Sequence, residues 1–73
     1  MEEYFKIRSY GYGELAQMYF PNIAKNSATV QFRRWIRVNT NLQNQLNISG
    51  FKIGQKLLTP KQVELIINSF GEP

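Results

Sequence analysis

The sequence contains no cysteine, no histidine and no aspartate. These absences remove the most common general base, the strongest side-chain nucleophile and most of the usual metal ligands together. The acids that remain are five glutamates dispersed along the chain. We therefore expect a protein that is not an enzyme and that uses no metal or other cofactor. The lack of cysteine is also typical of a reducing, intracellular compartment.

Long apolar runs are absent as well. No stretch approaches the eighteen or so apolar residues of a membrane span, and the start, Met1-Glu2-Glu3, lacks the basic and apolar regions of a secretory signal. We expect a cytoplasmic protein that does not enter a membrane. Its 73 residues predict one domain spanning residues 1–73, small enough that only roughly 60% of the unfolded surface can be buried.

Acidic residues are missing from the whole middle of the chain. Between Leu15 and Val63 there are seven basic residues and no acid, so this segment carries +7 although the whole chain carries only +4. The seven are Lys25, Arg33, Arg34, Arg37, Lys52, Lys56 and Lys61. Such an asymmetry predicts an anionic partner, either nucleic acid or an anionic membrane surface.

Local patterns predict the first two elements. Residues 4–8 alternate apolar and basic side chains, as in a short strand with one buried face. The two glycines in residues 10–13 predict a turn. A short helix should then cover residues 14–20 and end at Pro21, which cannot continue it.

A second helix is predicted over residues 27–39, capped by Asn26 or Ser27. At 100° per residue its side chains separate into two faces. The expected core face consists of Ala28, Phe32, Trp35, Ile36 and Asn39. The opposite face carries Thr29, Val30, Arg33, Arg34 and Arg37. Arginines four residues apart repel one another, so their placement on one exposed face favours an anionic partner.

The remaining sequence predicts two more helices and an extended segment. Residues 40–50 should form a polar helix capped by Thr40, with Leu42 and Leu46 facing inward. Residues 51–58 alternate around Gly54, as a small hairpin or wing does. The last helix should start at Thr59 and end at Gly71, with a capping box from Thr59 to Gln62, Pro60 in its first turn, and a hydrophobic staple between Leu58 and Val63.

Together these elements predict a mainly α, helix-turn-helix-like domain with a short N-terminal strand and a small β wing. A helix fits the major groove of DNA, and basic side chains beside it can contact the phosphates. We therefore expect a transcriptional or mobile-element regulator that binds double-stranded DNA. The residues expected to bind are Lys25, Ser27, Thr29, Val30, Arg33, Arg34, Arg37, Lys52 and Lys56. Of these, Ser27, Thr29, Val30 and Arg33 would face bases, whereas Arg34, Arg37, Lys52 and Lys56 would contact phosphates.

Several segments resemble a known family. The runs YGYGELAQMYFP (residues 10–21), FRRWI (32–36), LLTPKQV (57–63) and GEP (71–73) are similar to the bacterial domain-of-unknown-function 4248 family. This resemblance implies no activity, although genes of that family look to lie near those of histone-like DNA-binding proteins. A looser similarity links the helix after Gly13, the arginine helix and residues 58–67 to the winged helix-turn-helix of MerR and excisionase proteins. The connection over residues 21–26 is longer than the tight turn of that motif.

Other partners stay open at this point. A protein-interaction adaptor could use an aromatic surface, because tyrosine is enriched at interfaces. That surface would consist of Tyr4, Tyr10, Tyr12, Tyr19 and Phe51. RNA is a further alternative, and a homodimer or a partner protein is compatible with the small size. No feature of the sequence predicts a small-molecule substrate.

Overall fold

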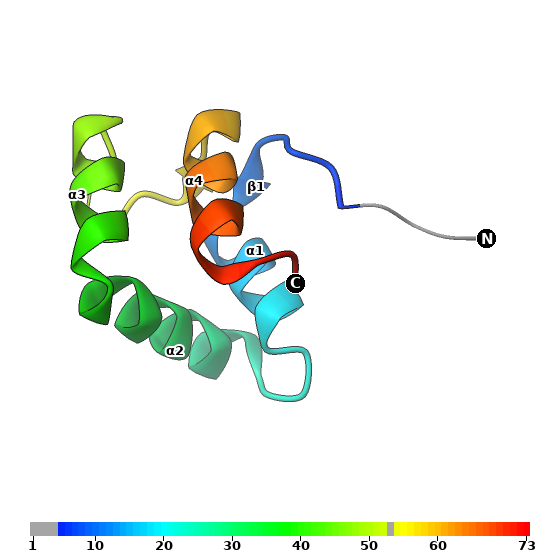
Figure 1. Cartoon of the computed structure of the whole chain (residues 1–73). Coiled ribbons are helices and arrows are strands. Elements are labelled where there is room, and N and C mark those ends of the chain that lie inside the picture. Colours follow the sequence, from blue (N-terminus) through cyan, green and yellow to red (C-terminus); the bar gives the residue numbers. More distant parts are fainter. Residues whose placement is uncertain (1–4, 53) are drawn as a thin grey trace.

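A computed structural model of the chain describes residues 5–52 and 54–73. Within these residues the chain forms four α-helices and one two-stranded antiparallel sheet (Figure 1). The elements are β1 (Tyr10–Gly11), α1 (Tyr12–Tyr19), α2 (Lys25–Val38), α3 (Thr40–Ile48), β2 (Leu57–Leu58) and α4 (Pro60–Phe70). The predicted fold class, a small and mainly α domain with a short strand near the N-terminus, is confirmed.

The helices enclose one hydrophobic core. Helix α1 packs against α2, and α3 contacts both α2 and α4; in Figure 1, α3 and α4 stand side by side above α2. Phe32 of α2 is completely buried at the centre, with its ring 5.3 Å from that of Tyr12 and 5.5 Å from that of Tyr19. Each helix adds a fully buried residue, including Leu15, Leu42 and Ile66. Burial of large side chains is the main stabilising contribution available to a chain of this size.

The predicted core face of the second helix is largely confirmed. Ala28, Phe32 and Ile36 are buried, one helical turn apart. Trp35 is an exception, because it lies at the edge of the core and keeps 38% of its surface exposed. Its ring packs against Phe70 at a centroid distance of 5.0 Å. Trp35 therefore covers the edge of the core and does not lie inside it.

The start of α4 follows the sequence prediction closely. Thr59 accepts a hydrogen bond from the Gln62 backbone N–H at 3.2 Å, and the Gln62 side chain accepts one from the Thr59 N–H at 3.0 Å. Pro60 occupies the first turn, and Leu58 and Val63 are both fully buried. The capping box is confirmed, and so is the end of the helix at Gly71, whose φ of 85° lies in the left-handed region.

Two predicted helix caps are wrong. Helix α2 starts at Lys25 after Ala24, and neither Asn26 nor Ser27 caps it, since both lie inside its first turn. The loop before it is held instead by Gln17, whose side-chain amide donates to the carbonyls of Phe20 and Ile23. Helix α3 is capped one residue earlier than predicted.

The residue that caps α3 is Asn39, whose side-chain oxygen accepts a hydrogen bond from the Leu42 N–H at 3.1 Å. The sequence pattern predicts Asn39 on the core face of the preceding helix and Thr40 as the cap, and both predictions are wrong. Because Asn39 leaves the helical conformation, α2 ends at Val38 and the chain turns directly into α3.

The predicted strand and hairpin are also corrected. Residues 5–9 form no strand, and Tyr4 lies outside the described residues. The strand lies at Tyr10–Gly11, where the glycines predict a turn, and it pairs with β2 in the register Tyr10 to Leu58. The predicted wing is therefore not a self-contained hairpin, because its second arm pairs with the N-terminal segment.

The first arm of that expected hairpin makes other contacts. The Phe51 N–H donates to the Leu46 carbonyl at 2.9 Å, which ties this arm to the end of α3. A turn around Gly54 is present, closed by a hydrogen bond from the Gln55 N–H to the Lys52 carbonyl at 3.0 Å. Beyond this turn the Lys56 carbonyl accepts from the Tyr12 N–H at 2.8 Å, which brings residues 54–56 next to the start of α1.

Candidate nucleic-acid interface

A hollow of about 760 Å³ lies between the start of α1, one side of α2 and the segment that leads into β2. We call it the basic hollow, because four of the side chains that line it are cationic. These are Lys25, Arg33, Arg37 and Lys56. The other lining residues are Gly11, Tyr12, Gly13, Glu14, Thr29, Ile36, Gln43, Phe51, Gly54 and Gln55. The hollow therefore brings together residues that are distant in the sequence, from Gly11 to Lys56.

The helical repeat of α2 places three of the cations on one wall. Lys25, Arg33 and Arg37 lie at spacings of eight and four residues, so they follow one side of the helix, with Thr29 between them. The buried residues Ala28, Phe32 and Ile36 fix the rotation of the helix. Arg33 and Arg37 are exposed, as predicted.

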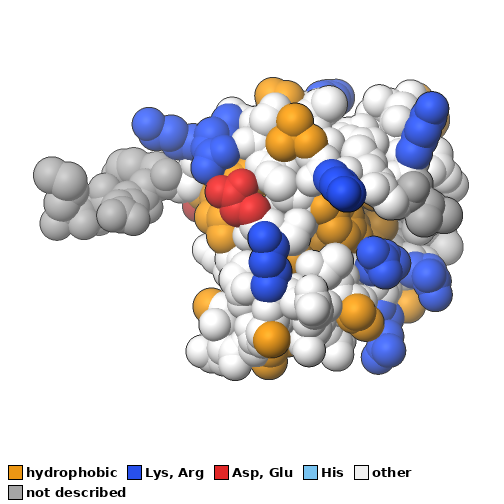
Figure 2. All heavy atoms as spheres, turned by 180° about the vertical axis from the view of Figure 1, so that it is seen from behind, with side chains coloured by type: hydrophobic (Ala, Val, Ile, Leu, Met, Phe, Trp, Pro, Cys, Tyr) orange, Lys and Arg blue, Asp and Glu red, His pale blue; other side chains and the backbone are white. Residues whose placement is uncertain are grey.

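The cations of the basic hollow are not neutralised by the rest of the described chain. Among residues 5–52 and 54–73, the ion pairs are Arg8 with Glu14 and Lys61 with Glu64. In the view from behind (Figure 2), lysine and arginine side chains are spread over the face, and little acidic surface is visible among them. Unpaired cations around a concave surface raise the local concentration of anions.

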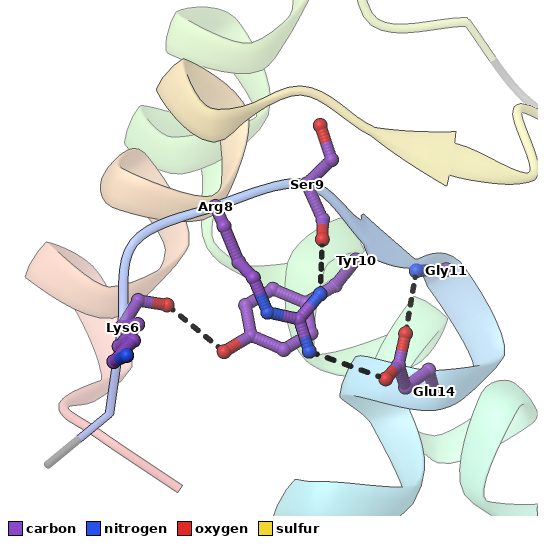
Figure 3. Close-up of polar contacts among 6 residues, drawn as sticks. All are labelled: Lys6, Arg8, Ser9, Tyr10, Gly11 and Glu14. Atoms are coloured by element: carbon purple, nitrogen blue, oxygen red, sulfur yellow. Dashed lines mark hydrogen bonds and ion pairs between the residues drawn. The ribbon is translucent and has the colours of Figure 1, made fainter.

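Glu14 lines the basic hollow but is engaged elsewhere (Figure 3). One carboxylate oxygen accepts a hydrogen bond from the Gly11 N–H at 3.1 Å, at the start of α1, where a negative charge is favourable. The other lies 3.5 Å from the Arg8 guanidinium. Arg8 also lies over the Tyr10 ring at 3.7 Å and donates to the Ser9 carbonyl at 2.6 Å. Arg8 thus offsets the charge of the acid at the rim.

Two aromatic rings line the inner part of the basic hollow. Phe51 is half-buried and packs against Tyr12 with ring centroids 6.1 Å apart. Burial raises the pKa of the Tyr12 hydroxyl above its usual value, and the nearby Arg33 guanidinium opposes this rise. The phenol therefore stays neutral at physiological pH and leaves the positive charge of Arg33 uncompensated.

The side chain of Lys25 crosses α1 at Gly13, where the missing β-carbon leaves room for it. A β-carbon at Gly13 would lie 2.8 Å from Cε of Lys25 and 3.5 Å from Oγ1 of Thr29. The Lys25 side chain therefore lies directly over the backbone of α1. The sequence pattern predicts a turn at the two glycines of residues 10–13, whereas the structure places Gly13 in the first turn of α1.

The structure divides the nine predicted binding residues into two groups. Five line the basic hollow: Lys25, Thr29, Arg33, Arg37 and Lys56. Four do not: Ser27, Val30, Arg34 and Lys52, which are all exposed. Ser27 and Val30 border a second, shallow depression farther around α2. The hydroxyl of Thr29 donates to the Lys25 carbonyl at 2.9 Å, so it can accept a hydrogen bond from a ligand but has no free hydrogen to donate.

Sequence reasoning missed the polar residues that complete the hollow. Gln43 projects from α3 and Gln55 from the segment before β2. Gln55 is anchored, because its side chain donates to the Gln62 side chain at 2.7 Å and to the Leu57 carbonyl at 2.6 Å. Only their positions in three dimensions identify them, since neither belongs to a basic or helical-face pattern.

The predicted aromatic surface of an adaptor is not confirmed. Tyr10 and Tyr12 are buried core residues, with exposed fractions of 4% and 8%. Tyr19 and Phe51 are half-buried, and Tyr4 lies outside the described residues. The four described rings each pack against another aromatic ring, so these residues stabilise the core and do not form an open patch.

Two kinds of site are absent from the described part of the chain. No helix in residues 5–52 and 54–73 has both the length and the hydrophobicity needed to cross a membrane. The same residues contain no cluster of three or more histidine, cysteine, aspartate or glutamate side chains suited to a metal ion.

The fold and the basic hollow define a small helical domain with one concave, cationic surface. Residues 6–73 match the family model described as Domain of unknown function (DUF4248), so the chain belongs to this family. Comparisons with curated proteins and with solved structures gave no significant match.

Proposed function

We propose that this protein is a non-enzymatic DNA-binding module that acts as a transcriptional or mobile-element regulator, with α2 as its main contact element. The observation that carries this proposal is the group of four cations around the basic hollow, none of which forms an ion pair within the described residues, although one acid, Glu14, also lines the hollow. Glu14 itself is paired with Arg8. A DNA partner of this kind would place the protein in the cytoplasm.

The geometry suggests a role for each group of residues. Lys25, Arg33, Arg37 and Lys56 converge on the basic hollow, where they would bind phosphate oxygens and set the position of the protein. Farther around α2, Ser27, Val30 and Arg34 are exposed on a face that could enter a groove of the duplex. Lys52 would contact the backbone at the edge of this surface. A helix-turn-helix reader would use α2 in this way, with α1 supporting it.

The test is a titration with random-sequence duplex DNA at two salt concentrations, for example about 50 and 200 mM. DNA binding predicts that affinity falls steeply with salt. It also predicts that changing Arg33, Arg34 and Arg37 to alanine lowers the slope by roughly one unit for each phosphate that is no longer bound. A matched control changes Lys6 and Lys61, which are exposed but lie outside the basic hollow, and should alter the slope less. Absence of binding at low salt would contradict the proposal.

A protein-interaction adaptor is the second candidate, and one observation favours it. Val38 and Ile48 have exposed fractions of 73% and 87%, the highest among the large apolar side chains of the described residues. Exposed apolar residues can contribute to protein interfaces. Failure of DNA binding together with self-association that disappears in Val38→Ser and Ile48→Ser variants would support this candidate.

A further inference from the structure

The shape of the basic hollow favours a particular form of DNA. Its volume of about 760 Å³ is within the range, roughly 300–1,000 Å³, of sites that enclose small ligands. In a regular duplex the bases are stacked inside the helix, and a concave site of this kind could contact only the outer phosphates. An unpaired nucleotide, in contrast, can leave the stack and enter such a site.

We propose that the basic hollow binds one unstacked nucleotide of DNA, with its phosphate on the cations and its base against Phe51. This inference rests on the proposed DNA-binding function and specifies the substrate: DNA that is single-stranded or that carries an unpaired nucleotide. Three features of the hollow carry it, namely the cations, the aromatic ring and a free amide side chain.

The cations and the aromatic ring belong to the same concave surface. Arg33, Arg37 and Lys25 line the wall formed by α2, and Lys56 lies on the other side. Phe51 is half-buried, so part of its ring remains accessible in the hollow after it has packed against Tyr12. A positive surface next to an exposed ring is the combination that binds single-stranded nucleic acid, because phosphates need cations and every base has a face that can stack.

The polar lining of the hollow also supplies an amide side chain, that of Gln43, which could form hydrogen bonds with the edge of the base. Gln43 is half-buried, and its side chain makes no hydrogen bond to any other described residue. Its amide therefore offers a donor and an acceptor side by side, the pattern that matches the edge of a base. Gln55 differs from Gln43, because its amide already donates to the Gln62 side chain and to the Leu57 carbonyl. These two hydrogen bonds fix the position of Gln55 in the wall of the hollow.

The experiment compares three fluorescent DNA probes by anisotropy: a perfect duplex, the same duplex with one extrahelical nucleotide, and the single strand. We expect the wild-type protein to bind the last two more tightly than the perfect duplex. The Phe51→Leu variant should bind the extrahelical and single-stranded probes at least roughly five-fold more weakly, the lower end for removal of one stacked base. Its affinity for the perfect duplex and its salt slope should not change.

The control variant is Phe20→Leu. Phe20 is also half-buried and also packs against an aromatic ring, Trp35 at 4.7 Å, but it does not line the hollow. We expect it to bind all three probes as the wild type does. Equal effects of the two variants, or equal affinity of the wild type for the perfect and the extrahelical duplex, would overturn the inference.

A second measurement needs no variant and keeps the inference testable if Phe51→Leu does not fold. An extrahelical 2-aminopurine is fluorescent when unstacked, and stacking on an aromatic ring should quench it when the wild-type protein binds. Unchanged fluorescence at saturation would overturn the inference while leaving the DNA-binding function intact. Failure to bind any of the three probes would instead overturn the proposed function itself.

Discussion

Gly13 of α1 lies directly beneath the side chain of Lys25 of α2: a β-carbon at position 13 would come within 2.8 Å of the lysine Cε. The glycine therefore leaves room for the lysine side chain to cross α1 beside the basic hollow. The contact links the packing of α1 on α2 to the position of one cation of the proposed binding surface.

The first prediction concerns Gly13→Ala. Alanine favours a helix by about 0.5–1 kcal/mol over glycine, and the flexible end of Lys25 can move aside at small cost. We expect the free energy of unfolding to change by less than about 1 kcal/mol, whereas DNA affinity falls because the ammonium group is displaced. Urea unfolding and anisotropy titrations measure the two effects.

A double-mutant cycle makes this prediction specific to the lysine. Lys25→Met removes the ammonium group but keeps most of the side chain. If Gly13→Ala acts through Lys25, adding it to Lys25→Met should cause no further loss of affinity. Full additivity of the two losses of DNA affinity would contradict the explanation. A fall of several kcal/mol in the free energy of unfolding of Gly13→Ala would also contradict it.

The second prediction concerns Glu14→Gln. Glutamine can still accept the hydrogen bond from the Gly11 N–H, but it removes the negative charge at the rim of the hollow. The ion pair with Arg8 joins side chains that are 54% and 51% exposed, so its loss should change stability by no more than about 1 kcal/mol. We expect DNA affinity to rise, by up to about five-fold at low salt, and the gain to shrink as salt increases.

Glu64→Gln is the matched control for this charge change. Glu64 also pairs with a cation, Lys61 at 3.7 Å, and its side chain is equally exposed, but it lies outside the basic hollow. We expect Glu64→Gln to raise the DNA affinity clearly less than Glu14→Gln does. Identical gains for the two variants would show that only the net charge of the protein matters.

The third prediction concerns Gln62, a buried residue of α4 that supports the wall of the hollow. Its side-chain oxygen accepts hydrogen bonds from the Thr59 N–H and from the Gln55 amide. Leucine is similar in size but cannot accept either bond. We expect Gln62→Leu to lower the free energy of unfolding by about 1–3 kcal/mol and to weaken DNA binding by releasing Gln55.

Thr59→Ala separates these two effects. It removes the hydroxyl that accepts the hydrogen bond from the Gln62 N–H in the capping box, and it should lower the free energy of unfolding by about 0.5–2 kcal/mol. Because it leaves the bond between Gln62 and Gln55 in place, the DNA affinity of the folded protein should not change. A loss of affinity as large as that of Gln62→Leu would argue against a positioning role for Gln62.

The fourth prediction concerns pH. Burial raises the pKa of Tyr19 to about 12, and the nearby Glu72 acts in the same direction. The hydroxyl also donates to the Gly71 carbonyl. Because the folded pKa lies above the unfolded value of 10.0, the neutral phenol stabilises the fold fully below about pH 10, and this contribution is lost as pH rises toward about 12.

Thermal unfolding of the wild type and Tyr19→Phe across this range measures the effect. Lysines also titrate there, so the informative quantity is the difference between the two proteins. We expect the wild type to lose stability more steeply with rising pH than the variant. Parallel curves would contradict the assignment to Tyr19.

Local signals explain which parts of the fold could be predicted. The start of α4 is encoded by neighbouring residues, Thr59, Pro60 and Gln62, and the structure confirms it. The sheet could not be found in this way, because each strand has two residues and pairs Tyr10 with Leu58, which is distant in sequence. Two residues are too few for an alternating pattern to be recognised.

The candidate site also has one part that a local pattern predicts and other parts that depend on residues distant in the sequence. The helical repeat of α2 is sufficient to place Arg33 and Arg37 on one exposed face. The other walls depend on tertiary packing, which brings Phe51 and Gln43 toward α2. Composition alone makes Tyr12 a candidate interface residue, whereas packing against Phe32 makes it part of the core.

If DNA binds at the basic hollow, adding DNA to the labelled protein should shift the amide resonances of the residues that line it. The largest shifts should occur at Lys25, Thr29, Arg33, Arg37 and Lys56, and the exposed side of α4 around Glu64 should change little. Shifts centred on α4, or no shifts at low salt, would contradict it.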